Sequence, residues 1–201
     1  QLVVEALAPR DGETVLDLCA GTGIKTSQIL AMAPGAVLTA VDLDGRKLAR
    51  GVALCRAMGL PLPATRAADA RTLAEGDLAG TADAVLLDAP CTGLGTLVRR
   101  PEVRYVRRGQ DVAAAASLQA DLLRAAARLL KPGGRLVYAV CSFTVEEGAA
   151  VIARTLQDLP GLAPDPIATD APFLRPDGTL AILPWRHGMD GFFVARLRRN
   201  A

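Results

Sequence analysis

Two cysteines stand where apolar strands are expected to end. Cys91 lies in the stretch "DAPCTGLG", which follows the apolar run "DAVLL", and Cys141 lies in "YAVCSF", 50 residues later. A thiolate is a nucleophile, and a carboxylate beside it, here Asp88, can act on the edge of a bound substrate. The pattern therefore predicts covalent catalysis at the tips of two adjacent strands.

Methylation of a cytosine at C5 is a reaction that needs this set of groups. A thiolate that adds to C6 turns C5 into an enamine carbon, which attacks a methyl sulfonium while an acid near N3 takes up the developing charge. A base then strips the C5 proton and the thiol leaves. Because a free cysteine has a pKa of about 8.5, a cation is expected nearby, and Lys25 and the arginines near position 100 are candidates.

The remaining cysteines do not suggest a metal or a disulfide framework. Cys55 falls in mid-helix and is interpreted as a small buried hydrophobe, whereas Cys19 is a loop residue whose backbone is expected to meet a cofactor. The four cysteines form no C-x-x-C pair, and His187 is the single histidine. We therefore predict free thiols in a reducing cytoplasm, and no metal.

A glycine-rich turn, "DLCAGTGIKT", follows the first apolar strand. Gly21 and Gly23 allow a ligand to approach the backbone closely, and Asp42, about 20 residues on, is placed to hold ribose hydroxyls. The dinucleotide fingerprint wants a third glycine near position 26, where Thr26 stands. With Asp69 placed to accept a hydrogen bond from an adenine amino group, the turn predicts S-adenosylmethionine. A tight strand-to-helix turn without a ligand is the alternative.

Strands that alternate with helices must position these residues. Apolar runs predict strands at Thr14–Leu18, Ala36–Asp42, Pro63–Asp69, Ala82–Pro90, Arg135–Ser142, Leu180–Pro184 and Gly191–Arg199. Helical spacing predicts helices at Lys25–Ala33, Gly45–Leu60, Asp111–Gly134 and Val145–Leu159, and residues 160–176 are expected to form a long loop. The result is an α/β fold, a mostly parallel seven-stranded sheet with helices on both faces and an antiparallel C-terminal strand.

Ligands of such sheets bind beyond the carboxyl ends of the strands. Five polar residues fall at or just past these ends, namely Asp17, Asp42, Asp69, Asp88 and Cys141. This shared position predicts one site before any family is considered.

Composition fits one domain with a core of alanine, valine and leucine. The 201 residues are 51% hydrophobic and 3% aromatic, and the net charge of +2 is by itself a weak argument for a nucleic-acid partner. No apolar run approaches the roughly 20 residues that span a bilayer, so no membrane partner is expected. The chain opens at "QLVVEALAP" without an initiator methionine, which predicts a piece cut from a longer protein.

The same stretches carry a resemblance. "VLDLCAGTGIKT", "DAPCTGLGTLVRRPEVRY", "VYAVCSFTVEEG" and "GMDGFFVARLRR" occur in this order over nearly the whole chain. They resemble the cofactor motif, the Asp-Ala-Pro-Cys-Ser-Gly block, the Thr-Cys-Ser block and the closing Asp-Gly-Phe-Phe strand of the Nol/Nop/Sun (Fmu-type) RNA cytosine-5 methyltransferases. The two cysteine blocks together are highly specific. The resemblance implies a class I methyltransferase fold, which is Rossmann-like, and formation of 5-methylcytosine in RNA, with S-adenosylhomocysteine as the other product.

Roles that the residue pattern leaves open follow from the resemblance. It implies that Cys141 is the nucleophile, that Cys91 assists release, and that Asp88 contacts the cytosine edge near the methyl donor. DNA cytosine methyltransferases, whose nucleophile lies in a Pro-Cys block, would favour Cys91, but the match over the full chain decides for Cys141. The implied catalytic residues are Cys141, Cys91, Asp88 and Lys25. The implied cofactor-binding residues are Cys19, Ala20, Gly21, Thr22, Gly23, Ile24, Lys25, Asp42, Asp69 and Asp88.

An arginine-rich segment, "RRPEVRYVRR", directly follows the Cys91 block and holds five arginines and a tyrosine in ten residues. Arginines there can meet phosphates and a tyrosine can stack on a base, although a lone charge run is more often a solvated loop. Its position beside Cys91 favours RNA contact by Arg99, Arg100, Arg104 and Tyr105. Because the target base must leave its stack, the expected partner is a single-stranded or loop region of ribosomal RNA.

We therefore expect residues 1–201 to be a monomeric, cytoplasmic methyltransferase domain that lacks an upstream RNA-binding domain. The chain departs from the family pattern in three places: Gly21-Thr22-Gly23-Ile24 replaces Ala-Pro-Gly-Gly, Val140 replaces a threonine, and Gly148 replaces an asparagine. The altered cofactor turn motivates a second hypothesis, an RNA-binding assembly factor that has lost catalysis. A methyltransferase of a small molecule or protein is a third.

Overall fold

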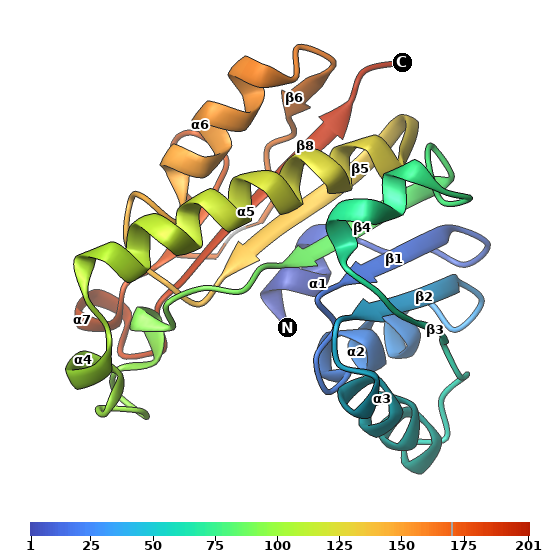
Figure 1. Ribbon diagram of the computed structural model, residues 1–201, viewed down its shortest axis with the longest axis horizontal. Coiled ribbons are helices and arrows are strands. Elements are labelled where there is room, and N and C mark those ends of the chain that lie inside the picture. The colour runs from blue at the N-terminus through green and yellow to red at the C-terminus, as the bar shows by residue number, and fades with distance from the viewer. Residues whose placement is uncertain (170) are drawn as a thin grey trace.

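A computed structural model describes residues 1–169 and 171–201, and it places eight strands in one sheet (Figure 1). The strands are β1 (Thr14–Leu18), β2 (Val37–Asp42), β3 (Ala64–Ala67), β4 (Ala82–Asp88), β5 (Leu130–Val140), β6 (Leu162–Pro164), β7 (Leu180–Ile182) and β8 (Phe192–Arg199). Their order is β3-β2-β1-β4-β5-β8-β6, and β7 pairs with β8 beside this path. The strands from β1 to β5 pair in parallel, whereas β8 is antiparallel to β5, β6 and β7.

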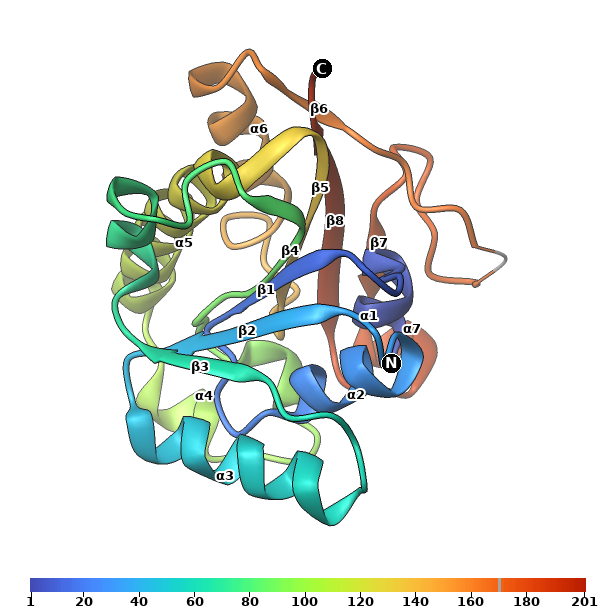
Figure 2. The same cartoon turned by 90° about the vertical axis from the view of Figure 1, so that its right-hand side faces the viewer.

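Helices cover both faces of the sheet, as predicted. They are α1 (Leu2–Leu7), α2 (Ile24–Met32), α3 (Gly45–Ala57), α4 (Val103–Val106), α5 (Gly109–Leu129), α6 (Ala149–Asp158) and α7 (Pro184–His187), with single 3-10 turns η1 (Ala70–Glu75) and η2 (Leu94–Thr96). Figure 2 shows α5 and α6 on one side of the sheet and α1 and α2 on the other. Among the described residues, no helix has the length and apolar character needed to cross a membrane.

The central strands are buried on both faces, which explains their continuous apolar runs. Leu16 of β1, Leu86 of β4 and Val137 of β5 are each fully buried. At the edge of the sheet, all four residues of β3 are exposed, so its apolar signal in the sequence is weak. The core therefore forms two layers, one on each side of β1, β4 and β5.

The predicted number of seven strands is wrong by one. The additional strand, β6, lies inside residues 160–176, which were expected to form a loop and of which residue 170 is outside the described residues. β6 has three residues and ends at Pro164, so it is too short to show alternation. It pairs with the last residues of β8, and β7 pairs with the first, so the predicted antiparallel pairing at the C-terminus is confirmed.

The bounds of the predicted helices hold in part. The helix expected at Asp111–Gly134 is α5, which ends at Leu129, and the stop that "KPGG" predicts is confirmed, because Pro132 has no N–H to donate and its ring would collide with the carbonyl four residues earlier. The helix expected at Gly45–Leu60 is α3, which ends at Ala57. The helix expected from Val145 begins only at Ala149, after a turn. The unpredicted helices α1, α4 and α7 have six residues or fewer, too few for a helical period to show.

Candidate active site

The two cysteines predicted to share a site lie together. Their Sγ atoms are 2.9 Å apart, and both thiols are free and half-buried. The parallel pairing of β4 with β5 sets Asp88 opposite Ala139, so the residues that follow each strand emerge side by side. Cys141 comes directly after β5, and Cys91 comes three residues after the end of β4.

The two thiols are not equivalent. A hydrogen bond from Cys91 lowers the pKa of the Cys141 thiol below its usual value, and the charge of Lys25 acts in the same direction, against burial and the charge of Asp88. The same sulfur contact, together with burial, raises the pKa of Cys91. The first proton lost from the pair therefore leaves Cys141.

Lys25 and Asp88 form an ion pair beside the thiols. Lys25 Nζ lies 2.6 Å from Asp88 Oδ2, and about a quarter of each side chain is exposed. The ammonium also lies 5.6 Å from the centre of the Phe192 ring, at the start of β8. The first turn of α2 and the end of β4 thus bring a cation and a carboxylate to one edge of the site. The sequence analysis did not identify Phe192.

A cavity of about 290 Å³ lies next to this edge, beyond the ends of β2 and β3. Three residues of the predicted cofactor set line it, Cys19, Asp42 and Asp69. Asp42 accepts hydrogen bonds from the backbone N–H groups of Gly21 and Asp44, both 2.9 Å long. Asp69 Oδ2 pairs with Arg71 at 2.6 Å, and this pair lowers the pKa of Asp69. Pro90, Leu43, Leu118 and Leu122 supply the apolar walls.

The glycine-rich turn before α2 has a conformation that its sequence requires. Cys19 and Gly21 have φ angles of 60° and 57°, in the left-handed region. A Cβ on Gly23 would lie 2.5 Å from the Cα of Gly51, so this glycine lets α2 pack against α3. The turn therefore presents backbone N–H groups rather than side chains toward the strand ends.

The seven predicted residues of this turn do not all face one cavity. Ala20, Gly21 and Gly23 line a small space between the turn and the side chain of Thr65, and Thr22 is exposed. Ile24 and Lys25 line a different cavity of about 350 Å³, together with Leu2 of α1 and Phe192 of β8. The turn thus separates the cavity lined by Asp42 and Asp69 from one on the α1 side.

Asp17 of β1, which the predicted cofactor set omits, is fully buried beneath the turn. Its Oδ2 accepts a hydrogen bond of 2.6 Å from Thr26, and its Oδ1 has no partner among the described residues. Burial raises the pKa of this carboxyl to about 7, although the Thr26 hydrogen bond opposes the rise. The sequence analysis placed Asp17 among the five polar residues at strand ends, because it is an acidic residue inside the apolar run "TVLDL", and gave it no cofactor-binding role.

Behind the thiols, Glu147 is also fully buried and bonds to the residues that follow both cysteines, Thr92 and Ser142. The sequence analysis placed Glu147 on a helix and gave it no part in the site.

The arginine-rich segment follows η2 and forms the turn before α4, α4 itself and the two residues after it. Arg99 pairs with Asp190, Arg100 pairs with Glu102, and the Arg104 guanidinium lies 5.8 Å from the Tyr105 ring centre. The Tyr105 side chain does not pack against the core, since 81% of the residue is exposed.

Arg107, from the same segment, donates a hydrogen bond of 3.0 Å to the carbonyl of Thr92, next to Cys91. The segment is therefore tied directly to the loop that carries one of the two thiols.

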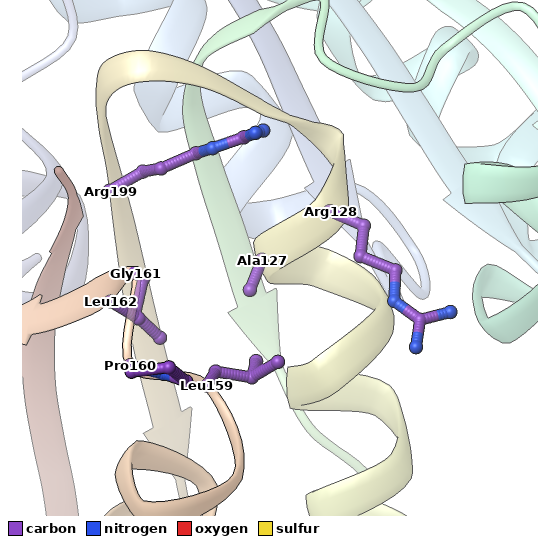
Figure 3. A pocket seen from close by; sticks show the side chains of 7 residues that line it. All are labelled: Ala127, Arg128, Leu159, Pro160, Gly161, Leu162 and Arg199. Atoms are coloured by element: carbon purple, nitrogen blue, oxygen red, sulfur yellow. The ribbon is translucent and has the colours of Figure 1, made fainter. Parts of the chain in front are cut away.

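A hollow of about 260 Å³ between the ends of α5 and α6 lies elsewhere (Figure 3). It is lined by Ala127, Arg128 and Arg199 and by the loop before β6. Arg199 donates a hydrogen bond to the carbonyl of Leu130, the first residue of β5, so this hollow is at the end of the strands opposite the thiols. No predicted site residue lines it. In the described part of the chain, no three or more His, Cys, Asp or Glu side chains are grouped so as to hold a metal ion.

Comparison with known proteins agrees with this geometry. A sequence model of the 16S rRNA methyltransferase RsmB/F family matches residues 4–198. Ribosomal RNA small subunit methyltransferase B of Salmonella arizonae is 40% identical over 198 residues, which are 98% of this chain and 44% of that protein. The protein of the same name from Thermus thermophilus is 40% identical over 193 residues, 96% of this chain and 46% of that one. The chain therefore spans less than half the length of these relatives.

A solved structure gives the same result for the fold. NSun6 from Pyrococcus horikoshii, in complex with SFG, an analogue of S-adenosylmethionine, superposes with a TM-score of 0.88 at 27% identity, over 100% of this chain and 51% of that one. The predicted class I methyltransferase fold is confirmed, and the SFG bound by NSun6 agrees with the predicted cofactor. From its matched residues and its fold, the chain belongs to the RsmB/F family of 16S rRNA methyltransferases, as the resemblance to Nol/Nop/Sun proteins predicted.

Proposed function

We propose that this chain is the catalytic domain of a ribosomal RNA cytosine-5 methyltransferase that forms a covalent bond between Cys141 and C6 of the target base. The observation that carries the proposal is the pair of thiols 2.9 Å apart, with the Lys25–Asp88 ion pair at the same edge. Enzymes that methylate an exocyclic nitrogen or a hydroxyl do not need a thiol nucleophile, whereas attack by the unreactive C5 of cytosine does.

Cys141 is the better nucleophile of the two. Its lowered pKa gives it the larger thiolate fraction near neutral pH, and Cys91 stabilises that thiolate with its own S–H group. The charge of Lys25 supports ionisation of Cys141. This physical argument agrees with the role that the family resemblance implies.

In the reaction, the sulfur of Cys141 forms a bond to C6, and the C5=C6 electrons become available at C5. The Lys25–Asp88 pair faces the base edge, where it supplies a proton or hydrogen bond to N3 as charge develops there. C5 would then take the methyl carbon of bound S-adenosylmethionine as the bond between that carbon and the sulfonium sulfur breaks, which leaves S-adenosylhomocysteine. A base takes the C5 proton. As C5=C6 forms again, the S–C6 bond breaks, and the S–H of Cys91 stabilises the departing thiolate.

The residues at the cavity fit S-adenosylmethionine. The unpartnered Oδ1 of Asp17 is a buried acceptor beneath the turn, suited to the cationic amino group of the methionine part. Asp42 and Asp69 are suited to the ribose and adenine, between apolar walls. When bound, this cofactor supplies the methyl group as a sulfonium.

The altered cofactor turn does not favour the hypothesis of a non-catalytic assembly factor. That hypothesis depends on Ile24, which replaces a glycine in the family pattern. The Ile24 side chain lines the cavity on the α1 side, and it is absent from the lining of the cavity that holds Asp42 and Asp69.

RNA reaches the site across the arginine-rich segment. Tyr105 and Arg104 are exposed there, and Arg107 links the segment to the Cys91 loop. We propose that Arg99, Arg100 and Arg104 contact phosphates, and that Tyr105 stacks on an unpaired base next to the target. Because the thiols are recessed, the substrate is a single-stranded or looped region from which the target cytosine is flipped.

The test is methyl transfer to a ribosomal RNA fragment, with the product nucleoside identified by mass spectrometry. We expect 5-methylcytosine from the unchanged chain and a loss of at least roughly 1,000-fold for Cys141→Ala. Cys91→Ala should accumulate an RNA–protein adduct that survives denaturation. Cys55→Ala, which removes a buried thiol in α3 far from the strand ends, is the matched control and should leave the rate unchanged. Full activity of Cys141→Ala, or a methyl group on another atom, would refute the proposal.

A further inference from the structure

A single buried carboxylate connects the two cysteine loops. Glu147 has no exposed surface, and its side-chain oxygens accept five hydrogen bonds from residues of both loops and of α5. The donors are the backbone N–H of Thr92 at 2.8 Å, the Thr92 hydroxyl at 2.5 Å, the Ser142 hydroxyl at 2.7 Å, the Gln119 amide at 3.1 Å and the Thr144 hydroxyl at 3.3 Å. A further hydrogen bond of 2.5 Å, from the Tyr138 hydroxyl to the Glu147 carbonyl, fixes its backbone.

Each of these donors is linked to a neighbour of a catalytic thiol. Thr92 follows Cys91 and Ser142 follows Cys141 in the sequence. Gln119 also donates, over 2.8 Å, to the carbonyl of Pro90, the residue before Cys91. Movement of one loop relative to the other would therefore break bonds to the same carboxylate, so Glu147 fixes the separation of the two sulfurs.

The carboxylate of Glu147 has no cationic partner. Its five hydrogen-bond donors are neutral groups, and among the described residues no lysine or arginine forms a salt bridge with it. Its negative charge is one of the causes that raise the pKa of Cys91. At Cys141, the hydrogen bond from Cys91, which depends on the contact of the two sulfurs, and the charge of Lys25 favour the thiolate.

We propose that Glu147 is a positioning residue that holds the two thiols in contact, so that one sulfur can donate its hydrogen bond to the other when that thiol ionises. This inference rests on the proposed function for its catalytic meaning. The arrangement of the thiols and their order of ionisation can, however, be measured without RNA or cofactor. Failure of the proposed function and failure of this inference are thus separate results.

The experiment measures alkylation of each cysteine by iodoacetamide against pH, with peptides quantified by mass spectrometry. In the unchanged chain, we expect Cys141 to react well before Cys91. Glu147→Gln keeps the size of the side chain and one oxygen acceptor but removes the charge, and it should reduce the ratio of the Cys141 rate to the Cys91 rate by about tenfold, the effect of one pKa unit. The neighbouring Glu146 is exposed, so Glu146→Gln is the matched control and should leave the ratio unchanged.

A purely structural role for Glu147 makes a different prediction. It would lower the free energy of unfolding, yet the ratio of the two alkylation rates in the folded fraction would stay as in the unchanged chain, and that result overturns the proposal. If Glu147→Gln does not fold, Ser142→Ala removes only the link on the Cys141 side. The proposal then predicts a slower methyl transfer with the Cys91 alkylation profile unaltered, and an unaltered rate of transfer would refute it.

Discussion

The buried carboxyl of Asp17 makes the stability of this protein depend on pH in an unusual direction. Its folded-state pKa is about 7, raised from 3.8 mainly by burial. A carboxyl with a raised pKa binds its proton more tightly in the folded state than in the unfolded state. The resulting stabilisation is complete below pH 3.8 and is lost as the pH rises to about 7.

The magnitude follows from the size of this rise. A change from 3.8 to about 7 corresponds to roughly 4 kcal/mol, which is the free energy that ionised Asp17 costs the folded state above neutral pH. Carboxyls with lowered pKa values, such as Glu13 and Asp83, contribute in the opposite sense, because their stabilisation is lost as the pH falls. In the unchanged chain alone, the pH dependence of the free energy of unfolding therefore contains contributions from both kinds of carboxyl.

Comparison with Asp17→Asn isolates the effect of this one carboxyl. The free energy of unfolding would be measured by urea denaturation, followed by circular dichroism, at several pH values from 4 to 8. We expect the unchanged chain to lose roughly 4 kcal/mol relative to Asp17→Asn across this range. Asp121→Asn, at an exposed position of α5, is the control, and its free energy of unfolding should depend on pH as that of the unchanged chain does. If the free energy of unfolding of Asp17→Asn also has the pH dependence of the unchanged chain, the Asp17 carboxyl is ionised throughout and the reasoning is wrong.

The same titration predicts the pH dependence of cofactor binding. If Oδ1 of Asp17 receives the cationic amino group of S-adenosylmethionine, only ionised Asp17 binds it well. Calorimetric titration should then show affinity increasing roughly tenfold from pH 5.5 to pH 7 in the unchanged chain, and little change in Asp17→Asn. An equal pH dependence in both proteins would show that the amino group lies elsewhere.

Two further predictions test the packing around the site. A Cβ on Gly95 would lie 2.0 Å from the Gly191 carbonyl oxygen and 2.9 Å from that of Cys141; Gly95→Ala should therefore lower the free energy of unfolding by roughly 2–4 kcal/mol, measured in urea, and slow methyl transfer. Gly109→Ala, where a Cβ meets nothing within 4 Å, is the control, and an equal effect of both would count against the steric argument. Ile24→Gly should cost about 1 kcal/mol of stability and change the affinity for S-adenosylmethionine less than threefold, roughly 0.6 kcal/mol. Affinity increased tenfold or more, by calorimetry, would show that the Ile24 side chain does obstruct the cofactor.

The sequence alone supported much of the fold because its strands are buried on both faces. Apolar runs located β1, β2, β4, β5 and β8, and the alternation with helices predicted a mostly parallel sheet. The errors fall where local signals are weak. β6 is three residues long, and α6 begins four residues later than its apolar pattern predicts.

The contact between the thiols was also predictable, because it follows from topology. Two parallel neighbouring strands end at the same edge, so residues just past β4 and β5 must come close, whatever the loops between them do. For the same reason Lys25, in the first turn after β1, comes close to Asp88 at the end of β4. Which strands are neighbours therefore determines which of these side chains lie close together, and the apolar pattern of the sequence locates the strands.

The difference in pKa between the two thiols has another origin, and the apolar pattern of the sequence does not predict it. Both cysteines follow apolar strands, so from the sequence they are nearly equivalent. In the structure, residues 145–148 form a turn instead of the first turn of a helix, and this turn directs Glu147 inward among Thr92, Ser142 and Gln119. The contact between the sulfurs and the cation Lys25 lower the pKa of Cys141. The arrangement that we propose for the two thiols thus depends on where a helix begins, which is the least reliable feature of a sequence pattern.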